Sequence, residues 1–339
     1  MKKTRILALV HDHLVPPEDT AGIDVLEAEW KMEYDVIETL KEIGHDVRVQ
    51  GIHDDLSGIR RAAEEFKPQI VFNLMEAFAG VTTFDQNVVS YLELLRLPYT
   101  GCNPRGLILA RDKALSKKLL AYHRIPVPEF TVVRRGRRPV LSKKMHFPLI
   151  VKSLFFEAST GISQASVVEH AEQLTRRVQF IHENLGTAAI VEQFIEGREL
   201  YVGVLGNDRL DVFPVWEMSF AKMPENRWHI ATERVKWSTQ YQKKHGIMTD
   251  AARLDPAATE VIQRIARRAY RALDLNGYAR VDLRMDDQGR PFVLEANPNP
   301  NLAYGEDFAE SAETGGLSYE RLLERILQLG LRWEPERTG

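Results

Sequence analysis

Apolar runs and amphipathic segments alternate along the N-terminal part of the chain. Short apolar runs at residues 6–10, 47–49 and 70–74 predict buried strands, and the segments 27–43 and 56–66 between them predict helices. Strands that alternate with helices in this way are typical of a parallel, doubly wound sheet. We therefore expect an N-terminal doubly wound α/β domain over residues 1–103.

The pattern then changes to one with several strands in a row, which predicts an α+β region. Asp112 is placed as the N-cap of a helix that presents Leu115, Leu119 and Leu120 on one face. A helix is also expected before this region, at 86–95. Within the region we expect a helix at 169–185 and strands at 131–133, 149–152, 188–194 and 199–205. We expect a central subdomain over 104–191 and a C-terminal subdomain over 192–339.

The C-terminal region combines an irregular stretch with a clear hairpin. Residues 216–254 show no sustained period and are predicted to form a long lid loop. Strands at 278–285 and 291–296 are joined by a turn of Asp286, Asp287, Gln288 and Gly289. Helices are expected at 256–273 and 318–329.

Composition excludes several classes of protein. The formal net charge is −3 with 27% charged residues, so the chain lacks the positive field of a nucleic-acid binder. A single cysteine, Cys102, excludes an intramolecular disulfide and fits a reducing compartment. The apolar run before His11 is too short for a signal peptide. No other apolar run approaches the ~20 residues that a membrane helix needs. We expect a cytoplasmic protein without membrane or nucleic-acid partners.

The predicted hairpin carries the strongest chemical signal. Arg280 and Asp282 share one face of the first strand, and Glu295 and Asn297 are spaced in the same way on the second. Two carboxylates and an amide oxygen suit Mg²⁺ that is shared with substrate phosphates. The alternative is an ordinary polar outer face, with Val281, Leu283, Val293 and Leu294 on the buried one. The rigid, carbonyl-rich segment Asn297-Pro298-Asn299-Pro300-Asn301 favours a site.

Arg280-Val281-Asp282 and Glu295-Ala296-Asn297 resemble the catalytic hairpin of ATP-grasp enzymes, in particular the D-alanine–D-alanine ligase branch. The resemblance implies an ATP-grasp fold in which Asp282, Glu295 and Asn297 hold two Mg²⁺ ions, with Mn²⁺ as an alternative. It also implies that Arg280 steadies the reacting oxygens.

The resemblance continues along the chain in family order. It implies that Lys113 and Lys152 reach the ATP phosphates, and that Ser159 belongs to the end of a phosphate-covering loop with a catalytic role. Lys236 resembles a lid lysine that touches the γ-phosphate and serves both binding and catalysis. The adenine and ribose are expected to meet Glu192, Gln193, Phe194, Ile195 and Glu199.

The sequence departs from the family where the first substrate would bind. The family's Gly-Gly-x-Ser-x-Glu segment is absent, and Asp24, Glu27 and Glu29 are the acids nearby. Glu76 stands near the position of a family histidine. The remaining departures are Phe155, Phe156 and Glu157 in the phosphate loop and Asn301 in place of a glycine. We therefore expect a changed first substrate.

These patterns predict an ATP-dependent carboxylate–amine ligase that acts through an acyl phosphate on amino acids or small peptides. Three alternatives remain open: a true D-alanine–D-alanine ligase, an ATP-binding regulator without ligase activity, and a ligase that modifies a protein. Analogy with the family also suggests a homodimer formed through the N-terminal domain.

Overall fold

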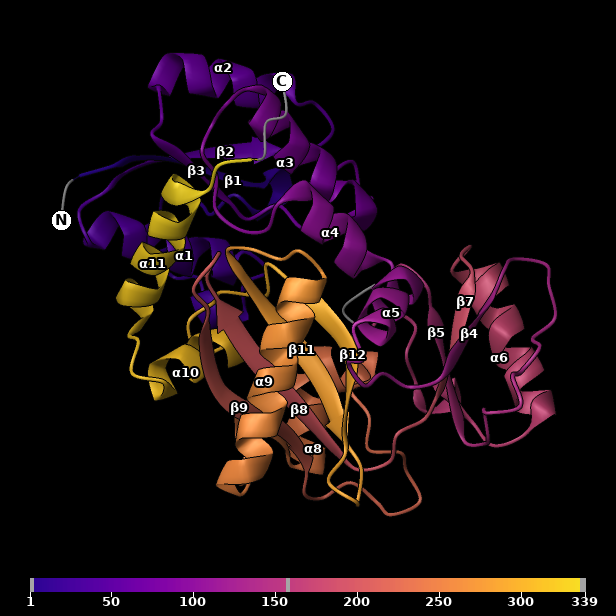
Figure 1. Ribbon diagram of the computed structural model, residues 1–339. Helices are drawn as coiled ribbons and strands as arrows, with labels where there is room; N and C mark the ends of the chain where they lie inside the picture. Colours follow the sequence, from indigo (N-terminus) through magenta and orange to yellow (C-terminus); the bar gives the residue numbers. More distant parts are fainter. Residues whose placement is uncertain (1–2, 157–158, 336–339) are drawn as a thin grey trace.

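A computed structural model of the chain describes residues 3–156 and 159–335. Within these residues the strands form three sheets, each with its own helices (Figure 1). No helix in the described part of the chain is long and apolar enough to cross a membrane. The division of the chain at residues 103 and 191 stays a prediction.

The N-terminal sheet is parallel, in the order β2 (Asp46–Ile52), β1 (Arg5–His11), β3 (Ile70–Asn73). Alternate residues of β1 pack on opposite faces, one face against α1 (Lys31–Glu42) and the other against α2 (Ser57–Phe66). This arrangement confirms the doubly wound domain.

Helix α1 begins later than the sequence predicted. A short 3-10 turn, Val25–Glu27, precedes it, and Trp30 occupies the N-cap position. Residues 27–30 therefore belong to the loop after β1, so the predicted start at residue 27 was wrong. Hydrophobic periodicity defines helix ends poorly, since it detects only the buried stripe.

Two helices that follow the N-terminal domain each begin at a capping residue. Asp112 caps α5 (Lys113–Tyr122) as predicted, accepting hydrogen bonds from the backbone of Ala114 and Leu115 at 2.9 Å each. Helix α4 (Pro104–Arg111) was not predicted, although Asn103 caps it and proline stands at its first position. That pair is a recognised start signal that the periodicity search overlooked.

The last helix, α11 (Tyr319–Arg332), returns to the N-terminal sheet, where it packs beside α1 and β3 (Figure 1). Gly330 allows this close approach, because a Cβ there would lie 2.4 Å from the carbonyl oxygen of Tyr99. The two ends of the chain thus build one domain, which no local pattern indicates. Helix α10 (Asp307–Thr314), just before it, was also not predicted.

The central sheet is antiparallel and has one covered face. Its strand order is β4 (Phe130–Val133), β7 (Ala189–Gln193), β5 (Leu149–Ser153), β6 (Val167–Val168). Leu149 and Val151 pack against α6 (Ala171–Asn184). The alternate residues of the same strands, among them Lys152 and Glu192, point to the other face.

The C-terminal sheet has five antiparallel strands and corrects the predicted lid loop. Its order is β10 (Ile247–Ala251), β9 (Asp211–Phe220), β8 (Arg198–Leu205), β11 (Tyr278–Met285), β12 (Pro291–Pro298). Residues 216–254 are not one long loop, since they hold the end of β9, the helices α7 (Glu233–Trp237) and α8 (Thr239–His245), and β10. Elements this short give no detectable period.

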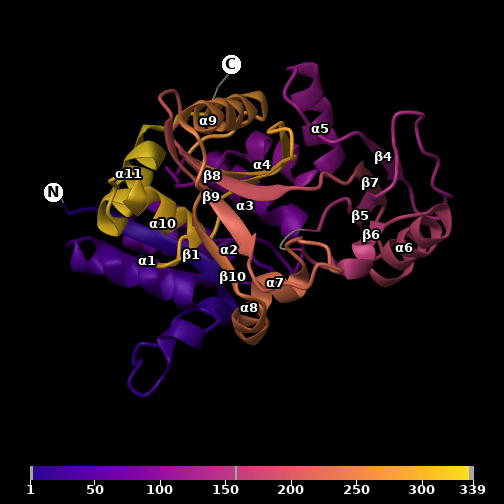
Figure 2. The same ribbon diagram turned by 90° about the horizontal axis from the view of Figure 1, so that it is seen from below.

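Helices cover both faces of this sheet. Helix α9 (Pro256–Ala272) packs on one face, while α7 and α8 lie on the other, beside β10 (Figure 2). The second face is not fully covered, and it turns toward the open face of the central sheet. The two open faces form the walls of a cleft.

Candidate active site

The cleft between the central and C-terminal sheets contains a pocket with an empty volume of about 700 Å³. That volume counts all the space between the two walls, including the part that is open to solvent. Every residue expected to bind ATP lines this pocket: Lys113, Lys152, Glu192, Gln193, Phe194, Ile195, Glu199 and Lys236. Ser159, Asp282 and Glu295 line it as well. Strand alternation explains the convergence, because each wall presents every second side chain.

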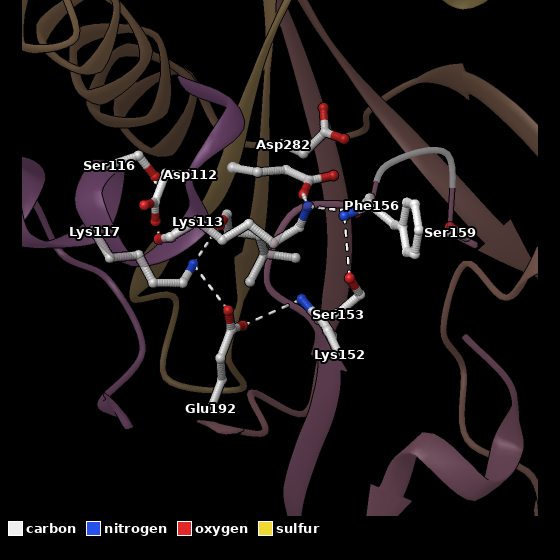
Figure 3. Close-up of polar contacts among 12 residues, drawn as sticks. Asp112, Lys113, Ser116, Lys117, Lys152, Ser153, Phe156, Ser159, Glu192 and Asp282 are labelled. Atoms are coloured by element: carbon white, nitrogen blue, oxygen red, sulfur yellow. Dashed lines mark hydrogen bonds and ion pairs between the residues drawn. The ribbon is translucent and has the colours of Figure 1, made fainter. Parts of the chain in front are cut away.

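A buried carboxylate lies at the centre of the charged groups (Figure 3). Glu192 is 1% exposed, and its Oε2 accepts a hydrogen bond from Lys152 Nζ at 3.2 Å. Lys117 Nζ lies 3.3 Å from the other oxygen, Oε1, and is itself fully buried. Burial acts to raise the pKa of Glu192, but the two lysines outweigh it and hold that pKa below its usual range.

Lys117 is a residue that the sequence analysis missed. Its ammonium also donates a hydrogen bond to the carbonyl oxygen of Leu294 in β12, so it joins both walls of the cleft. It stands four residues after Lys113 on the same helix, and such pairs share a face. The spacing of four residues from Lys113 could have identified Lys117 as a site residue from the sequence.

Lys113 connects the same helix to the metal candidates. Its Nζ donates to the carbonyl oxygen of Phe156 at 2.7 Å and lies 3.7 Å from Glu295 Oε2. Burial lowers the pKa of this ammonium, while Glu295 partly opposes that shift. Burial likewise acts to raise the pKa of Glu295, yet Lys113, Lys152 and further lysines reduce it to about 2. Glu295 is therefore ionised at any physiological pH.

The hairpin register brings the predicted set together. Asp282 pairs with Glu295 and Arg280 pairs with Asn297 across the two strands. A bulge after Asp282 lets Leu294 and Glu295 both face the pocket. Leu294 was predicted on the buried face, and this was wrong, because the bulge shifts the alternation by one residue.

Arg280 is already engaged by its neighbour. Its guanidinium donates to both oxygens of Asp282, at 2.8 and 2.9 Å, and lies 3.7 Å from Asp307. It also stacks over the Tyr201 ring at 4.7 Å. The fork fixes the guanidinium beside Asp282, which lines the pocket, whereas Arg280 itself is not among the residues that line it.

The donor set of the hairpin fits Mg²⁺. No group of three or more His, Cys, Asp or Glu side chains that could hold a metal occurs in the described chain, so protein ligands alone do not make a complete site. Asp282 and Glu295 line the pocket, whereas Asn297 is not among the residues that line it and reaches the set only through the hairpin register. Two carboxylates and an amide leave positions for phosphate oxygens, which is how Mg²⁺ commonly binds.

The remaining lining suits a nucleoside. Ile150, Phe194, Ile230 and Leu294 supply apolar surface. Glu199 is held by the Tyr201 hydroxyl at 3.0 Å and lies 3.4 Å from Arg284. Ser159 donates to the carbonyl oxygen of Ala231 at 2.7 Å, and its φ of 61° places it in the left-handed region. Glu157 lies outside the described residues.

Comparison with known proteins agrees with this geometry. The family model described as "D-ala D-ala ligase C-terminus" matches residues 119–328, more than half of the chain. The chain is 30% identical to the D-alanine–D-alanine ligase of Desulfotalea psychrophila over 83% of its own length and 84% of that protein. It is 32% identical to the uncharacterized protein y4sG of Sinorhizobium fredii, over 88% of this chain and 86% of that one.

Among solved structures, the D-alanine–D-alanine ligase of Bacillus anthracis in complex with ATP superposes with a TM-score of 0.74. The alignment covers 97% of this chain and 98% of that one at 20% identity, so it shows that the two chains share a fold. The chain belongs to the D-alanine–D-alanine ligase family of ATP-grasp carbon–nitrogen ligases.

The family match begins at residue 119, so it leaves out the N-terminal domain, in which several of the departures lie. Asp24, Glu27 and Glu29, the acids considered for substrate binding, are all exposed, and Asp24 caps the turn at Leu26. The structure therefore gives none of these three a recess of its own. Asn301 is exposed too, and its side chain accepts a hydrogen bond from the backbone of Ala303.

Two other acids lie at the carboxyl edge of the N-terminal sheet. Glu76 follows β3, and Glu33 is in the first turn of α1, which starts at that edge. Glu33 is 1% exposed, and its Oε1 has no partner among the described residues. Burial, with a smaller contribution from Glu76, raises the pKa of Glu33 to about 7. Glu76 is exposed to solvent, and desolvation by the surrounding protein acts to raise its pKa, with Asp85 in the same direction and Arg111 against it.

Proposed function

We propose that this protein joins a carboxylate to an amine at the expense of ATP, through an acyl phosphate, using amino acids or small peptides. The observation that carries the proposal is the convergence of Lys113, Lys152 and Lys236 with Asp282 and Glu295 in one pocket. Phosphoryl transfer needs this combination of positive charge and metal ligands around the transferred group.

The lysines are suited to the phosphates because they come from separate elements. Lys113 lies on α5, Lys152 on β5 and Lys236 on α7, so their ammonium groups approach the pocket from different sides. Charge that develops on the transferred phosphoryl group would meet a fixed positive environment rather than mobile water. The apolar lining around Phe194 would exclude water from the nucleoside.

Asp282, Glu295 and Asn297 would hold the magnesium ions. When bound, Mg²⁺ supplies neutralisation of phosphate charge, and Mn²⁺ can provide the same chemistry. The protein's part is to keep Glu295 ionised through its lysine neighbours and to hold Asp282 in the fork of Arg280.

Arg280 would stabilise the oxyanion formed when the amine attacks the acyl phosphate. It binds Asp282, which lines the pocket, and lies 3.7 Å from Asp307 at the start of α10. Guanidinium donors that remain near the reacting carbonyl would bind the tetrahedral oxyanion more strongly than the ground-state oxygen. The amine is itself the nucleophile: its nitrogen bonds to the carbonyl carbon as the bond to phosphate breaks, and its proton passes to solvent or to the released phosphate. No protein nucleophile is needed.

The test is release of inorganic phosphate from ATP and Mg²⁺ with pooled D- and L-amino acids, with Glu295→Ala as the inactive control. Release that requires a pair of amino acids, and is lost in the control, would support ligation. Release with D-alanine alone would favour a true D-alanine–D-alanine ligase, the activity in the names of several relatives. Silence in every pool, with ATP still bound, would favour a protein acceptor or a regulator.

The expected homodimer is a separate proposal. Sedimentation or light scattering of the purified protein tests it without any substrate.

A further inference from the structure

A buried arginine lies behind the loop of residues 159–166 that follows β5. Arg177 of α6 is 8% exposed, and its Cζ lies 4.4 Å from the centre of the Phe180 ring. No carboxylate pairs with it among the described residues, its Nε has no hydrogen-bond partner there, and burial lowers its pKa. A buried cation without a paired acid costs free energy, so ion pairing does not explain why it is here.

The guanidinium of Arg177 holds the loop from behind at two points. Its Nη2 donates hydrogen bonds to the carbonyl oxygen of Gly161 and to Ser166 Oγ, the second at 2.8 Å. Gly161 has a φ of 70°, and a Cβ there would lie 2.7 Å from the side chain of Leu185 at the end of α6. The loop is therefore seated closely on α6, and Arg177 fixes it there.

The other side of the loop faces the nucleotide pocket. The lining at this end includes Ser159 and Ile162 from the loop and the lysines Lys113, Lys152 and Lys236. These lysines are the groups proposed to meet the phosphates, so the loop lies at the phosphate end of the cleft. Arg177 is not among the residues that line the pocket, so it can act there only through the loop.

The loop is also tied to the helix that carries one of these lysines. Gly161 N–H donates to Glu233 Oε2 at 3.2 Å, and Glu233 N–H donates to the carbonyl oxygen of Ile162 at 3.1 Å. Glu233 is the first residue of α7, and Lys236 lies in the last turn of that helix. A loop that moved away from α6 would therefore change the position of Lys236 as well.

We propose that Arg177 is a positioning residue for the triphosphate, which seats the loop 159–166 on α6 so that the loop and Lys236 are in place when the nucleotide binds. The proposal rests on the proposed function only in that the cleft binds ATP. It requires no ligase activity, so the two can fail separately.

The test compares direct binding of ATP and of adenosine by calorimetry, with Mg²⁺ and without an amino acid substrate. Adenosine can meet the apolar lining but has no phosphate, so the ratio of the two affinities reports on the phosphate end of the cleft. Arg177→Met removes the donors and keeps a long apolar stem. Its affinity for ATP should fall about 10- to 100-fold, as for the loss of one hydrogen bond to a charged group, while its affinity for adenosine should change by less than about 2-fold.

Two further variants make the result specific to the guanidinium. Arg176→Met is the matched control and should keep the wild-type ratio, because Arg176 is exposed on the same helix and pairs with Glu172. Arg177→Lys keeps the charge but has a single ammonium, which cannot reproduce the fork on Gly161 and Ser166. Its ratio should lie between those of wild type and Arg177→Met.

The ratio of two affinities does not depend on the fraction of protein that is folded, so destabilisation alone leaves it unchanged. An unchanged ratio in Arg177→Met would overturn the proposal, as would an equal fall in both affinities. If that variant does not fold, an unchanged ratio in Arg177→Lys would overturn it instead. Wild-type protein that binds neither ATP nor adenosine would overturn this proposal and the proposed function together, whereas the expected ratios without ligation would overturn only the latter.

Discussion

The nucleotide cleft and the carboxyl edge of the N-terminal sheet differ in whether their buried carboxylates have cationic partners. In the cleft, Glu192 and Glu295 each have lysines nearby, and Asp282 has Arg280. At the N-terminal edge, Glu33 is buried with an oxygen that has no partner in the described chain, and the like-charged Glu76 adds to the rise in its pKa.

The difference shows which half of the site is complete without its ligand. A buried carboxylate without a partner is costly, and proteins tolerate this cost mainly where function requires it. The cleft carries the residues that resemble the family, together with the departure Phe156, while the N-terminal edge carries the departure Glu76. We therefore expect substitutions in the cleft to affect chemistry and those at the edge to affect substrate choice and stability.

The largest effect is expected for Glu295→Gln. The change keeps the shape but removes a charge that is set among several lysines, so phosphate release should fall by about 10³-fold or more. Steady-state assays measure this, with Asp287→Asn in the exposed turn of the same hairpin as the control. A fall of less than 10-fold would remove Glu295 from the proposed metal set.

Arg280→Lys should reduce kcat by about 10²-fold and leave the KM for ATP nearly unchanged. Lysine keeps the charge but cannot donate to both oxygens of Asp282, so the geometry at the pocket edge is lost. Arg290→Lys in the exposed turn serves as the control. If the variant instead raised the KM for ATP, Arg280 would contribute to nucleotide binding rather than to the chemical step.

Glu33→Gln should stabilise the protein at high pH. The folded-state pKa of about 7 lies above the ordinary value of 4.5, so ionisation disfavours the folded state as pH rises from below 4.5 to above 7. The free energy of unfolding of the variant should exceed that of wild type by about 1–3 kcal/mol at pH 8, and by little at pH 5.

Urea unfolding at the two pH values measures the effect of Glu33→Gln, with the exposed Glu29→Gln as a control. An equal gain at both pH values would mean that charge is not the cause.

The smallest effect is expected for Glu76→Gln, which should raise the KM for one amino acid substrate about 10-fold without changing the KM for ATP. The reason is that Glu76 is exposed at the carboxyl edge of the N-terminal sheet and does not line the nucleotide pocket. Kinetics with each substrate varied in turn test this, with the exposed Glu64→Gln as a control. A change confined to the KM for ATP would contradict the assignment of substrate choice to the N-terminal edge.

Much of this protein was determined by local sequence. Periodicity predicted the parallel N-terminal sheet, since buried strands and amphipathic helices carry distinct periods. The strand β11 (Tyr278–Met285) was predicted with its observed bounds, and Asp112 was identified as the cap of α5. The predicted ATP residues converge because strand alternation and family order both constrain them.

Other features depended on contacts between distant segments. The bulge that turns Leu294 into the pocket, the return of α11 to the N-terminal sheet and the lysine pair on Glu192 join residues far apart in the chain. The strands β9 and β10 show no period of their own, and pairing with each other and with β8 forms them. Sequence alone determined which elements exist and which residue types carry the chemistry. Only tertiary structure decided which buried charges meet a partner, because burial and electrostatic pairing are properties of the packed chain.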